Sequence, residues 1–491
     1  MGFPIHAPVF VALISFISNL LNYNTMTDRR RFLSLCSIAG TGVLAACISN
    51  REGKETQSRD LPTNFSETAI KSPTESPTPT TSLTETNEVK TQAAKVYPTD
   101  GDSGDWFGRS VAMSSEGATA IITTLFEEGT NGDGAGSAYI FETSGESWDQ
   151  QARLTPDDGN SEDWFGRSVA MSSDGTTTII GATGDEDPNG DLAGSAYVFE
   201  DNDNSWGQQA KLTPGDGDRE DFFGVSAAVS SDGTSAIIGA HRDKNSNGEE
   251  AGSAYVFQDR NGSWSQQAKL TPVDGDSGNR FGMSVAMSSD GTRAIIGAQN
   301  HDPSDGEIAG SAYVFKADDG SWSQQAKLTP DDGESNDGFG SAAAVSGDAT
   351  TAIISAHRDK NSNGEEAGSA YVFQDRNGSW SQQAKLTPDD GDSTDWFGSP
   401  VTLSSSGATA IIGASQDEDP NGEQAGSAYI FEANGGSWSQ QAKLASADGD
   451  SGDRFGVSMA VSDDATTALI GAPHDEDPNG KRAGSAYVFT L

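Results

Sequence analysis

The sequence predicts an all-β protein: a seven-bladed β-propeller of four-stranded blades, closed by an N-terminal strand that completes the last blade. A Phe-Gly pair recurs every 58 residues without insertion or deletion, and each period holds four short runs that alternate like β-strands. Fixed periods of this length are typical of radial arrays, in which each unit buries its faces against its neighbours. The Phe residues of the seven pairs are Phe107, Phe165, Phe223, Phe281, Phe339, Phe397 and Phe455.

The four strands of one period are clearest in the second unit. Ser168 to Ser172 alternates with a period of two and ends at a Ser-Asp-Gly turn, and Thr177 to Ala182 forms the next run. Gly194 to Phe199 and Trp206 to Leu212 follow, with polar turns between them. Pro214 ends the last run, because proline cannot donate to a strand ladder.

A Trp opens the fourth run of six units. Strict alternation along this run places Trp206, Gln208, Ala210 and Leu212 on one face. Because the Trp recurs at one position of the repeat, we expect it to pack between outer strands. The six residues are Trp148, Trp206, Trp264, Trp322, Trp380 and Trp438.

The two ends of the repeated region predict that the ring is closed. The last unit stops at Gly484 to Leu491 and holds three runs, whereas Gln92 to Val96 repeats the pattern of Gln150 to Leu154 one period earlier. We expect the N-terminal strand to pair with the last blade and to remove both open edges. The alternative is a linear solenoid with both partial units exposed.

The charge of the chain is strongly acidic. It contains 30 Lys and Arg against 73 Asp and Glu, and residues 1–90 are neutral, so the net charge of −43 falls on residues 91–491. Uniform acidity argues against nucleic acid and anionic lipid surfaces as partners, because phosphate binding needs clustered basic side chains. Solvation in very high salt, as in halophilic proteins, accounts for the bulk of the charge. Cation binding by particular loops is the second interpretation.

Residues 1–47 are predicted to be an export signal. Arg29 to Arg31 precede a short apolar, Gly-rich stretch, which resembles a twin-arginine signal, and the closing Leu-Ala-Ala-Cys resembles a lipobox. That resemblance makes Cys47 the lipidated first residue of the mature protein. An ordinary signal peptide and an uncleaved anchor remain alternatives. A second apolar run, Val9 to Leu21, sits awkwardly before such a signal, which indicates Met26 as the true start.

Residues 48–90 are rich in Thr, Ser and Pro and almost without aromatic residues. Such a segment cannot bury enough apolar surface to fold, so it is predicted to be a disordered stalk. Together with a propeller at 91–491, this organisation predicts an exported protein that is lipid-anchored on the outer face of the cytoplasmic membrane.

The repeated motifs carry a family resemblance. Phe-Gly, Ser-Val-Ala, Ile-Ile-Gly-Ala (Gly-Ala-Pro at Pro473) and Gly-Ser-Ala-Tyr-Val-Phe recur in this order, and residues 92–491 resemble FG-GAP repeats such as those of integrin α subunits. The resemblance implies a seven-bladed propeller, cation-binding loops and a role in extracellular recognition or adhesion. In integrins the calcium loop follows the Phe-Gly strand. Here that connection is only Ser173-Asp174-Gly175 and its equivalents, so the calcium residues of the family cannot be carried over.

A different loop, the one after Gly-Ala, offers oxygen ligands. Five units carry Asp-x-Asp/Asn-x-Asn-Gly, and calcium takes six to eight oxygens from side chains spaced in this way. The closing carboxylate of such a loop is missing, and the acidic connection Asp157 to Asp163 is the expected source of further ligands. The alternative is that Asp and Asn serve here as ordinary turn formers. The candidate Ca ligands are Asp185, Asp187, Asn189, Asp243, Asn245, Asn247, Asp359, Asn361, Asn363, Asp417, Asp419, Asn421, Asp475, Asp477 and Asn479.

No catalytic centre is predicted. A catalytic centre would show as a departure from the repeat, but His241 and His357 lie in nearly duplicate segments, and the propeller contains no cysteine. Trp106, Trp164 and Trp396, which precede Phe-Gly in three units, are the candidate ligand-binding residues and are expected to face the acidic rim.

These features predict a cell-surface binding or adhesion propeller that recognises an extracellular protein or polysaccharide, with Ca²⁺ as the candidate cofactor. The alternative is an extracellular hydrolase or lyase that acts on polysaccharides. The oligomeric state stays open.

Overall fold

The computed structural model describes residues 90–127, 131–145, 147–186, 188–203, 205–301, 309–418, 420–476 and 478–491. All of these belong to the second of two units of the chain, Thr84–Leu491. The predicted export signal, Cys47 and all of the predicted stalk except Lys90 lie outside the described residues. Every regular element in these ranges is a strand, and they contain no helix long and apolar enough to cross a membrane.

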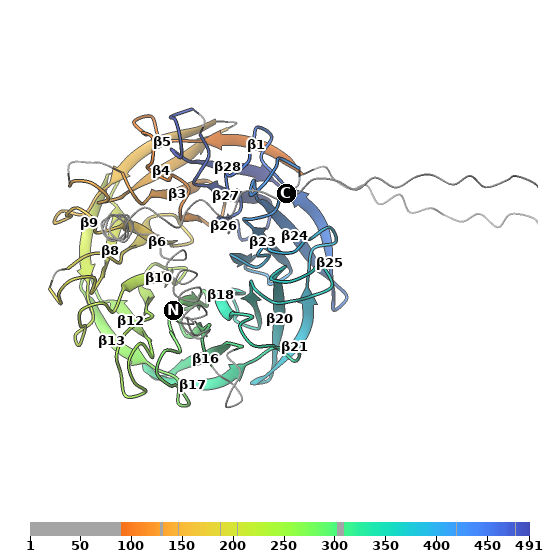
Figure 1. The fold of residues 1–491 in the computed structure, drawn as a ribbon. Helices are drawn as coiled ribbons and strands as arrows, with labels where there is room; N and C mark the ends of the chain where they lie inside the picture. Colours follow the sequence, from red (N-terminus) through yellow and green to blue (C-terminus); the bar gives the residue numbers. More distant parts are fainter. Residues whose placement is uncertain are drawn as a thin grey trace, which may run out of the picture. The chain divides into compact units, whose positions relative to one another are not determined.

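Seven four-stranded antiparallel sheets stand around one axis, as the sequence predicts (Figure 1). Six of them hold four strands that are consecutive in the chain. In each of these blades the first strand is the innermost and the fourth is the outermost. The seventh sheet has the order β1-β28-β27-β26, so the first strand of the chain is the outermost strand of the last blade.

The blades are numbered here in chain order, and the last includes β1. Blade 1 consists of β2 Val111–Met113, β3 Thr119–Thr124, β4 Ser137–Ser144 and β5 Ser147–Leu154, and blade 2 of β6 Phe165–Met171, β7 Thr177–Ala182, β8 Ser195–Asp201 and β9 Trp206–Leu212. Blade 3 consists of β10 Phe223–Val229, β11 Ser235–Ala240, β12 Ser253–Asp259 and β13 Trp264–Leu270, blade 4 of β14 Ser284–Met287, β15 Arg293–Ala298, β16 Ser311–Asp318 and β17 Ser321–Leu328, and blade 5 of β18 Phe339–Val345, β19 Thr351–Ala356, β20 Ser369–Arg376 and β21 Ser379–Leu386. Blade 6 consists of β22 Val401–Leu403, β23 Thr409–Ala414, β24 Ser427–Asn434 and β25 Ser437–Leu444, and blade 7 of β26 Ser458–Val461, β27 Thr467–Ala472, β28 Ser485–Thr490 and β1 Thr91–Val96.

The predicted closure by the N-terminal strand is confirmed. β1 pairs with β28 from Thr91, opposite Thr490, to Val96, opposite Ala486. The Gln92 side chain accepts a hydrogen bond from the Ala447 backbone N–H at 2.9 Å, as the equivalent Gln accepts one in the other blades. Both ends of the repeated region are therefore used within one sheet, and no open blade edge is left between them.

Neighbouring blades meet at a backbone seam formed by the Phe-Gly pair of one blade and the Ala-Gly pair that precedes the third strand of the blade before it. Phe223 N–H donates to Ala193 O at 2.9 Å, and the equivalent bond recurs at all seven seams between 2.8 and 3.0 Å. Gly194 has φ +83°, and a Cβ at this position would lie 2.1 Å from Phe223 O. Only glycine allows the two chains to approach so closely.

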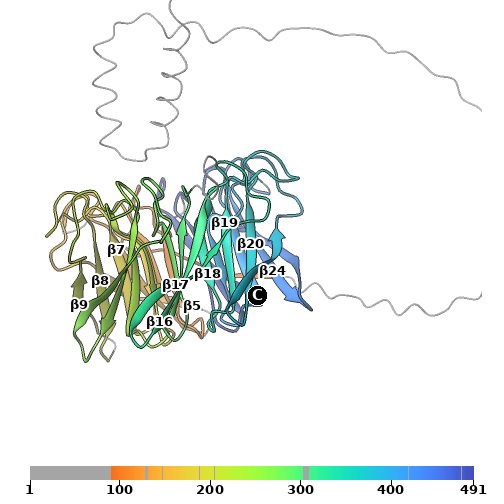
Figure 2. The ribbon, with the colours of Figure 1, turned by 90° about the horizontal axis from the view of Figure 1, so that it is seen from below.

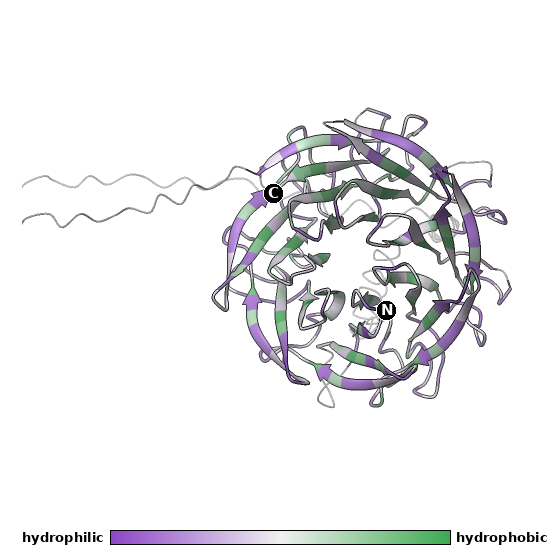
Figure 3. Ribbon diagram, turned by 180° about the vertical axis from the view of Figure 1, so that it is seen from behind, coloured by the Kyte–Doolittle hydropathy of each residue, from purple (hydrophilic) through white to green (hydrophobic). Residues whose placement is uncertain are grey.

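A hydrophobic core lies behind each seam. Phe223 is fully buried among Ile179 and Ala196 of the preceding blade and Ile238 and Tyr255 of its own. Equivalent clusters fill the other six interfaces, including the one where the last blade meets the first. Figure 3 shows the apolar residues concentrated on the inner strands and the hydrophilic ones on the outermost strands. The core of the propeller is thus divided among the interfaces between blades.

The fourth strands depart from the alternation that the sequence predicts. Val198 pairs with Ala210 and Phe199 with Gln208, so Gln209 is the extra residue of a β-bulge. Trp206 consequently packs against the preceding blade, whereas Ala210 and Leu212 pack toward the following one. The prediction of one shared face was wrong. The six Trp residues do pack between blades, as expected.

We expect Gly194→Ala to lower the free energy of unfolding by about 2–4 kcal/mol, because the added methyl group meets a carbonyl oxygen and the backbone is left-handed. Gly207→Ala is the matched control, since a Cβ there has no neighbour within 4 Å. Chemical denaturation of the two variants checks this. Equal effects of the two substitutions would contradict the close approach at the seam.

Candidate functional site

Two kinds of acidic loop lie side by side on one face of the ring, which is called here the loop face (Figure 2). One is the loop between the second and third strands of a blade, and the other is the connection to the next blade. Glu220 N–H donates to Asp191 O at 3.0 Å, and Phe222 N–H donates to Leu192 O at 3.1 Å, which joins a loop of blade 2 to the connection that follows that blade. The structure therefore brings together the two loop sets that the sequence analysis singled out.

The first carboxylate of the Asp-x-Asp/Asn-x-Asn-Gly loop is buried and forms an ion pair with a lysine of the protein. In blade 2, the Asp185 carboxylate lies 2.9 Å from Lys211 Nζ and accepts a hydrogen bond from the Tyr197 hydroxyl at 2.5 Å. The side chain of Asp185 is only 2 % exposed. Lys211 also reaches Asp158, in the connection from the preceding blade, at 2.7 Å. One ammonium group thus ties the loop, the outer strand and the connection together.

The same arrangement recurs where the loop begins with Asp. Burial alone would lower the pKa of Lys211, but the hydrogen bonds and charges of Asp158 and Asp185 raise it above its ordinary value, so the ammonium form is held. In the last blade the cation comes from Lys95 of β1, which therefore also takes part in ring closure. The other ion pairs of this kind are Lys269–Asp243, Lys385–Asp359 and Lys443–Asp417.

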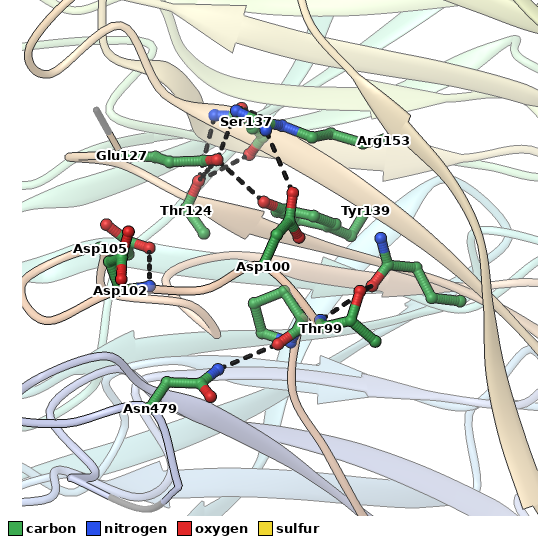
Figure 4. Close-up of polar contacts among 12 residues, drawn as sticks. Thr99, Asp100, Asp102, Asp105, Thr124, Glu127, Ser137, Tyr139, Arg153 and Asn479 are labelled. Carbon is green, nitrogen blue, oxygen red and sulfur yellow. Dashed lines mark hydrogen bonds and ion pairs between the residues drawn. The ribbon is translucent and has the colours of Figure 1, made fainter. Parts of the chain in front are cut away.

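Blades 1 and 4, whose loops lack the pattern, keep parts of this arrangement. In blade 1 Glu127 stands in place of the loop Asp and Arg153 in place of the lysine. Glu127 pairs with Arg153 and accepts a hydrogen bond from the Tyr139 hydroxyl (Figure 4). In blade 4, His301 replaces the acid, its Nδ1 lies 3.1 Å from Ser311 Oγ, and burial lowers its pKa. These loops therefore keep a buried polar anchor without the Asp pattern.

The described Asn residues of the loops also have partners within the protein. Asn245 donates to Gly252 O at 2.7 Å, and Asn247 donates to Pro272 O at 2.9 Å. Among the described residues, no group of three or more His, Cys, Asp or Glu side chains is placed to hold a metal ion. The described Asp and Asn side chains of these loops therefore have partners within the protein. Asp187, Asp419 and Asp477 lie outside the described residues, so calcium binding stays a prediction.

Sequence reasoning missed the lysines of the fourth strands as the partners of these carboxylates. Lys211 and its equivalents recur in each Gln-Gln-Ala-Lys-Leu run with the same period as the loop Asp. That shared period was a usable signal. The bulge at Gln209 concealed this pairing, because it reverses the side to which the residues after Gln209, Lys211 among them, point relative to strict alternation.

A second set of buried carboxylates caps the turns before Phe-Gly. Asp221 accepts a hydrogen bond from Asp218 N–H at 2.7 Å, and burial raises its pKa to about 7 against the lowering effect of that bond. In the fourth unit Asn279 accepts the equivalent bond, from Asp276 N–H at 2.6 Å. The turn therefore needs the oxygen of the side chain and not its charge.

The three candidate ligand-binding Trp residues stand at the inner end of the loop face, directly before Phe-Gly. They are half-buried and left-handed, with φ of 61° at Trp106, 55° at Trp164 and 58° at Trp396. Trp106 contacts the rings of Phe126 and His474, each with ring centroids 4.7 Å apart. They belong to three different blades and occupy one equivalent position.

We expect Lys211→Met to lower the free energy of unfolding by about 3 kcal/mol, because it leaves the buried Asp185 carboxylate without its cation. Lys244→Met is the control: Lys244 pairs with Glu249 at the surface, its side chain is 60 % exposed, and its removal should change stability far less. Denaturant titrations compare the two. A loss for Lys211→Met no larger than that of the control would exclude the buried ion pair as a stabilising element.

We expect Asp221→Asn to raise the melting temperature at pH 8 and to leave it unchanged near pH 4. The folded-state pKa of Asp221 is raised to about 7, so stability is lost progressively as the pH rises from the ordinary pKa of aspartate to about 7. Asn does not ionise and escapes this loss. The gain at pH 8 is on the order of 1 kcal/mol after screening by solvent. Asp218→Asn, at an exposed position, should show no such pH dependence.

The family model described as FG-GAP repeat matches the chain seven times, and together the matches cover more than half of it. They span residues 91–141, 148–199, 206–257, 264–315, 322–373, 380–431 and 438–489. No curated protein matches the chain. Each match contains the Phe-Gly pair and the Ala-Gly pair that form the seams. The chain belongs to the FG-GAP repeat family.

Proposed function

We propose that the protein is exported, lipid-anchored through Cys47, and binds an extracellular ligand, a polysaccharide or another protein, on the loop face of its propeller. The observation that carries this proposal is the rigid construction of that face. Buried ammonium–carboxylate pairs fix the loops of at least five blades. A surface fixed before binding loses little conformational freedom when a ligand arrives.

The half-buried Trp side chains at the inner end of the loop face support a binding role. Trp106, Trp164 and Trp396 offer aromatic surface that is held in place by the backbone seams, and such surface packs well against the apolar side of a sugar ring or a peptide. The long polar stalk and the lipobox-like sequence support display at a distance from the membrane. Binding without catalysis is the proposed activity.

The test uses the soluble propeller, Thr91–Leu491, whose strands close one ring with its own cores. We expect the immobilised fragment to retain at least one polysaccharide or surface protein in high salt without shortening it. Trp164→Ala should weaken retention about tenfold, by loss of aromatic contact, while Gln267→Ala, at an exposed position of the outermost strand β13, should not. Chain shortening of a retained polysaccharide would favour the hydrolase or lyase alternative.

Calcium dependence is part of the proposal and rests on the loop sequences. In the same assay, retention should fall when calcium is chelated, and calorimetry should show calcium binding that is lost when Asp187, Asp419 and Asp477 are changed to Asn. Unchanged calcium binding by this variant would remove calcium from the account. Retention that does not depend on calcium would leave the binding function standing.

A further inference from the structure

Six arginines lie at the inner end of the loop face, four beside the Phe-Gly pairs and two in the loops that contact the turns before those pairs. This axial arginine cluster consists of Arg109, Arg167, Arg242, Arg280, Arg454 and Arg482. Arg109 and Arg167 directly follow their Phe-Gly pairs, whereas Arg280 and Arg454 directly precede theirs. The other two arginines lie beside the turn before a Phe-Gly pair, since Arg242 N–H donates to Asp221 O at 3.3 Å and Arg482 O accepts a hydrogen bond from Trp106 N–H at 3.2 Å.

The arginines lie close enough to influence one another. Burial, followed by the charges of Arg167 and Arg454, lowers the pKa of Arg109 to about 9. Burial, followed by the charges of Arg242, Arg280 and Arg167, lowers the pKa of His241 to about 3. These neighbours come from the consecutive blades 7, 1, 2, 3 and 4, so the cluster follows an arc of the ring instead of belonging to one blade.

Most of these guanidinium groups have no acidic partner, although the chain has 73 acidic and only 30 basic residues. Within the described ranges, Arg109, Arg167, Arg242 and Arg454 form no ion pair, and Arg280 reaches only Glu250, at 3.7 Å. The lysine of an outer strand, by contrast, takes two carboxylates. In the described part of the chain, Nε of Arg242, Nε of Arg280 and Nδ1 of His241 are buried without a hydrogen-bond partner.

Aromatic rings stand among these cations. Trp106, Trp164, Phe222 and Trp396 occupy the position before Phe-Gly, and the Arg242 guanidinium lies 4.8 Å from the centre of the Phe222 ring. Phe222 shares the left-handed backbone of the Trp residues, with φ 55°.

An apolar cavity lies further along the axis. It measures about 260 Å³ and is lined mainly by Ala, Val, Leu and Met side chains, including Met171, Met287 and Leu403, which are the last residues of β6, β14 and β22. The arginines lie near the first residues of the innermost strands, so a charged ligand group bound by them is expected to stay outside this cavity.

We propose that the axial arginine cluster binds the carboxylate of a terminal uronic acid residue of an acidic polysaccharide, with the sugar ring packed on the neighbouring aromatic rings. Guanidinium groups bind carboxylates through two parallel hydrogen bonds, and a pyranose presents an apolar face that stacks on an aromatic ring. The acidic loops around the cluster repel further negative charges at low salt, which favours a chain end over an internal segment. This inference rests on the proposed binding function and specifies its ligand.

The test titrates the soluble propeller with glucuronate, glucose, acetate and a tetraglutamate peptide, by calorimetry in buffered salt. We expect glucuronate to bind at least tenfold more tightly than acetate and glucose not to bind measurably. Arg109→Gln together with Arg167→Gln should weaken glucuronate binding at least tenfold. Trp164→Ala should weaken glucuronate but not acetate. The control, Arg260→Gln, changes an exposed arginine on the outer edge and should leave all affinities unchanged.

The melting temperature of the protein, measured with and without glucuronate, gives a second readout. Since Arg109 and Arg167 repel each other without a counter-ion, their change to Gln should raise or preserve the melting temperature, and glucuronate should raise that of the wild type alone. A lower melting temperature would show that the arginines support the fold and would overturn the proposal. Tighter binding of the peptide than of glucuronate would overturn it in favour of an acidic protein ligand. Retention of a neutral polysaccharide by both wild type and the arginine variant would overturn it while the proposed binding function stands.

Discussion

The whole ring depends on one backbone contact, in which the Phe-Gly pair of each blade lies against the Ala-Gly pair of the blade before it. The contact is so close that Gly194 cannot carry a Cβ without meeting Phe223 O. It places the Phe ring into the core between two blades and fixes the start of the innermost strand. Since every blade uses this contact on both sides, the seven units share one geometry, and the ring closes where Phe107 N–H donates to Ala483 O.

Charge is arranged differently at different distances from the axis. On the outer strands of five blades a lysine, such as Lys211, is held between two carboxylates, which fastens the acidic loops to the blades. Near the axis the arginines of several blades meet with few acidic partners in the described residues. An acidic protein therefore surrounds a basic centre. The proposed anion site rests on this arrangement and not on the net charge, the bulk of which is attributed to solvation in high salt.

Much of the fold could be predicted from the sequence because the period is exact and the ends are complementary. The seven blades, the closure by Gln92 to Val96 and the packing of the outer Trp residues all follow from recurrence at fixed spacing. The side from which Leu212 packs could not be predicted, because the bulge at Gln209 leaves no mark on the alternation of polar and apolar residues. The two sets of acidic loops were predicted to lie on one face of the ring and to supply ligands together. That a lysine stands between them could not be read from either loop alone.

Hydrogen exchange at the seams tests the central claim most directly. If the ring is closed by the same contact that joins its internal blades, the Phe107 amide exchanges within about tenfold of the Phe223 amide, because both donate to carbonyl oxygens of equivalent Ala residues. Exchange of the Phe107 amide and of β1 at nearly the rate of an unprotected chain, with Phe223 still protected, would contradict the account. It would show an open array of blades in place of a closed ring.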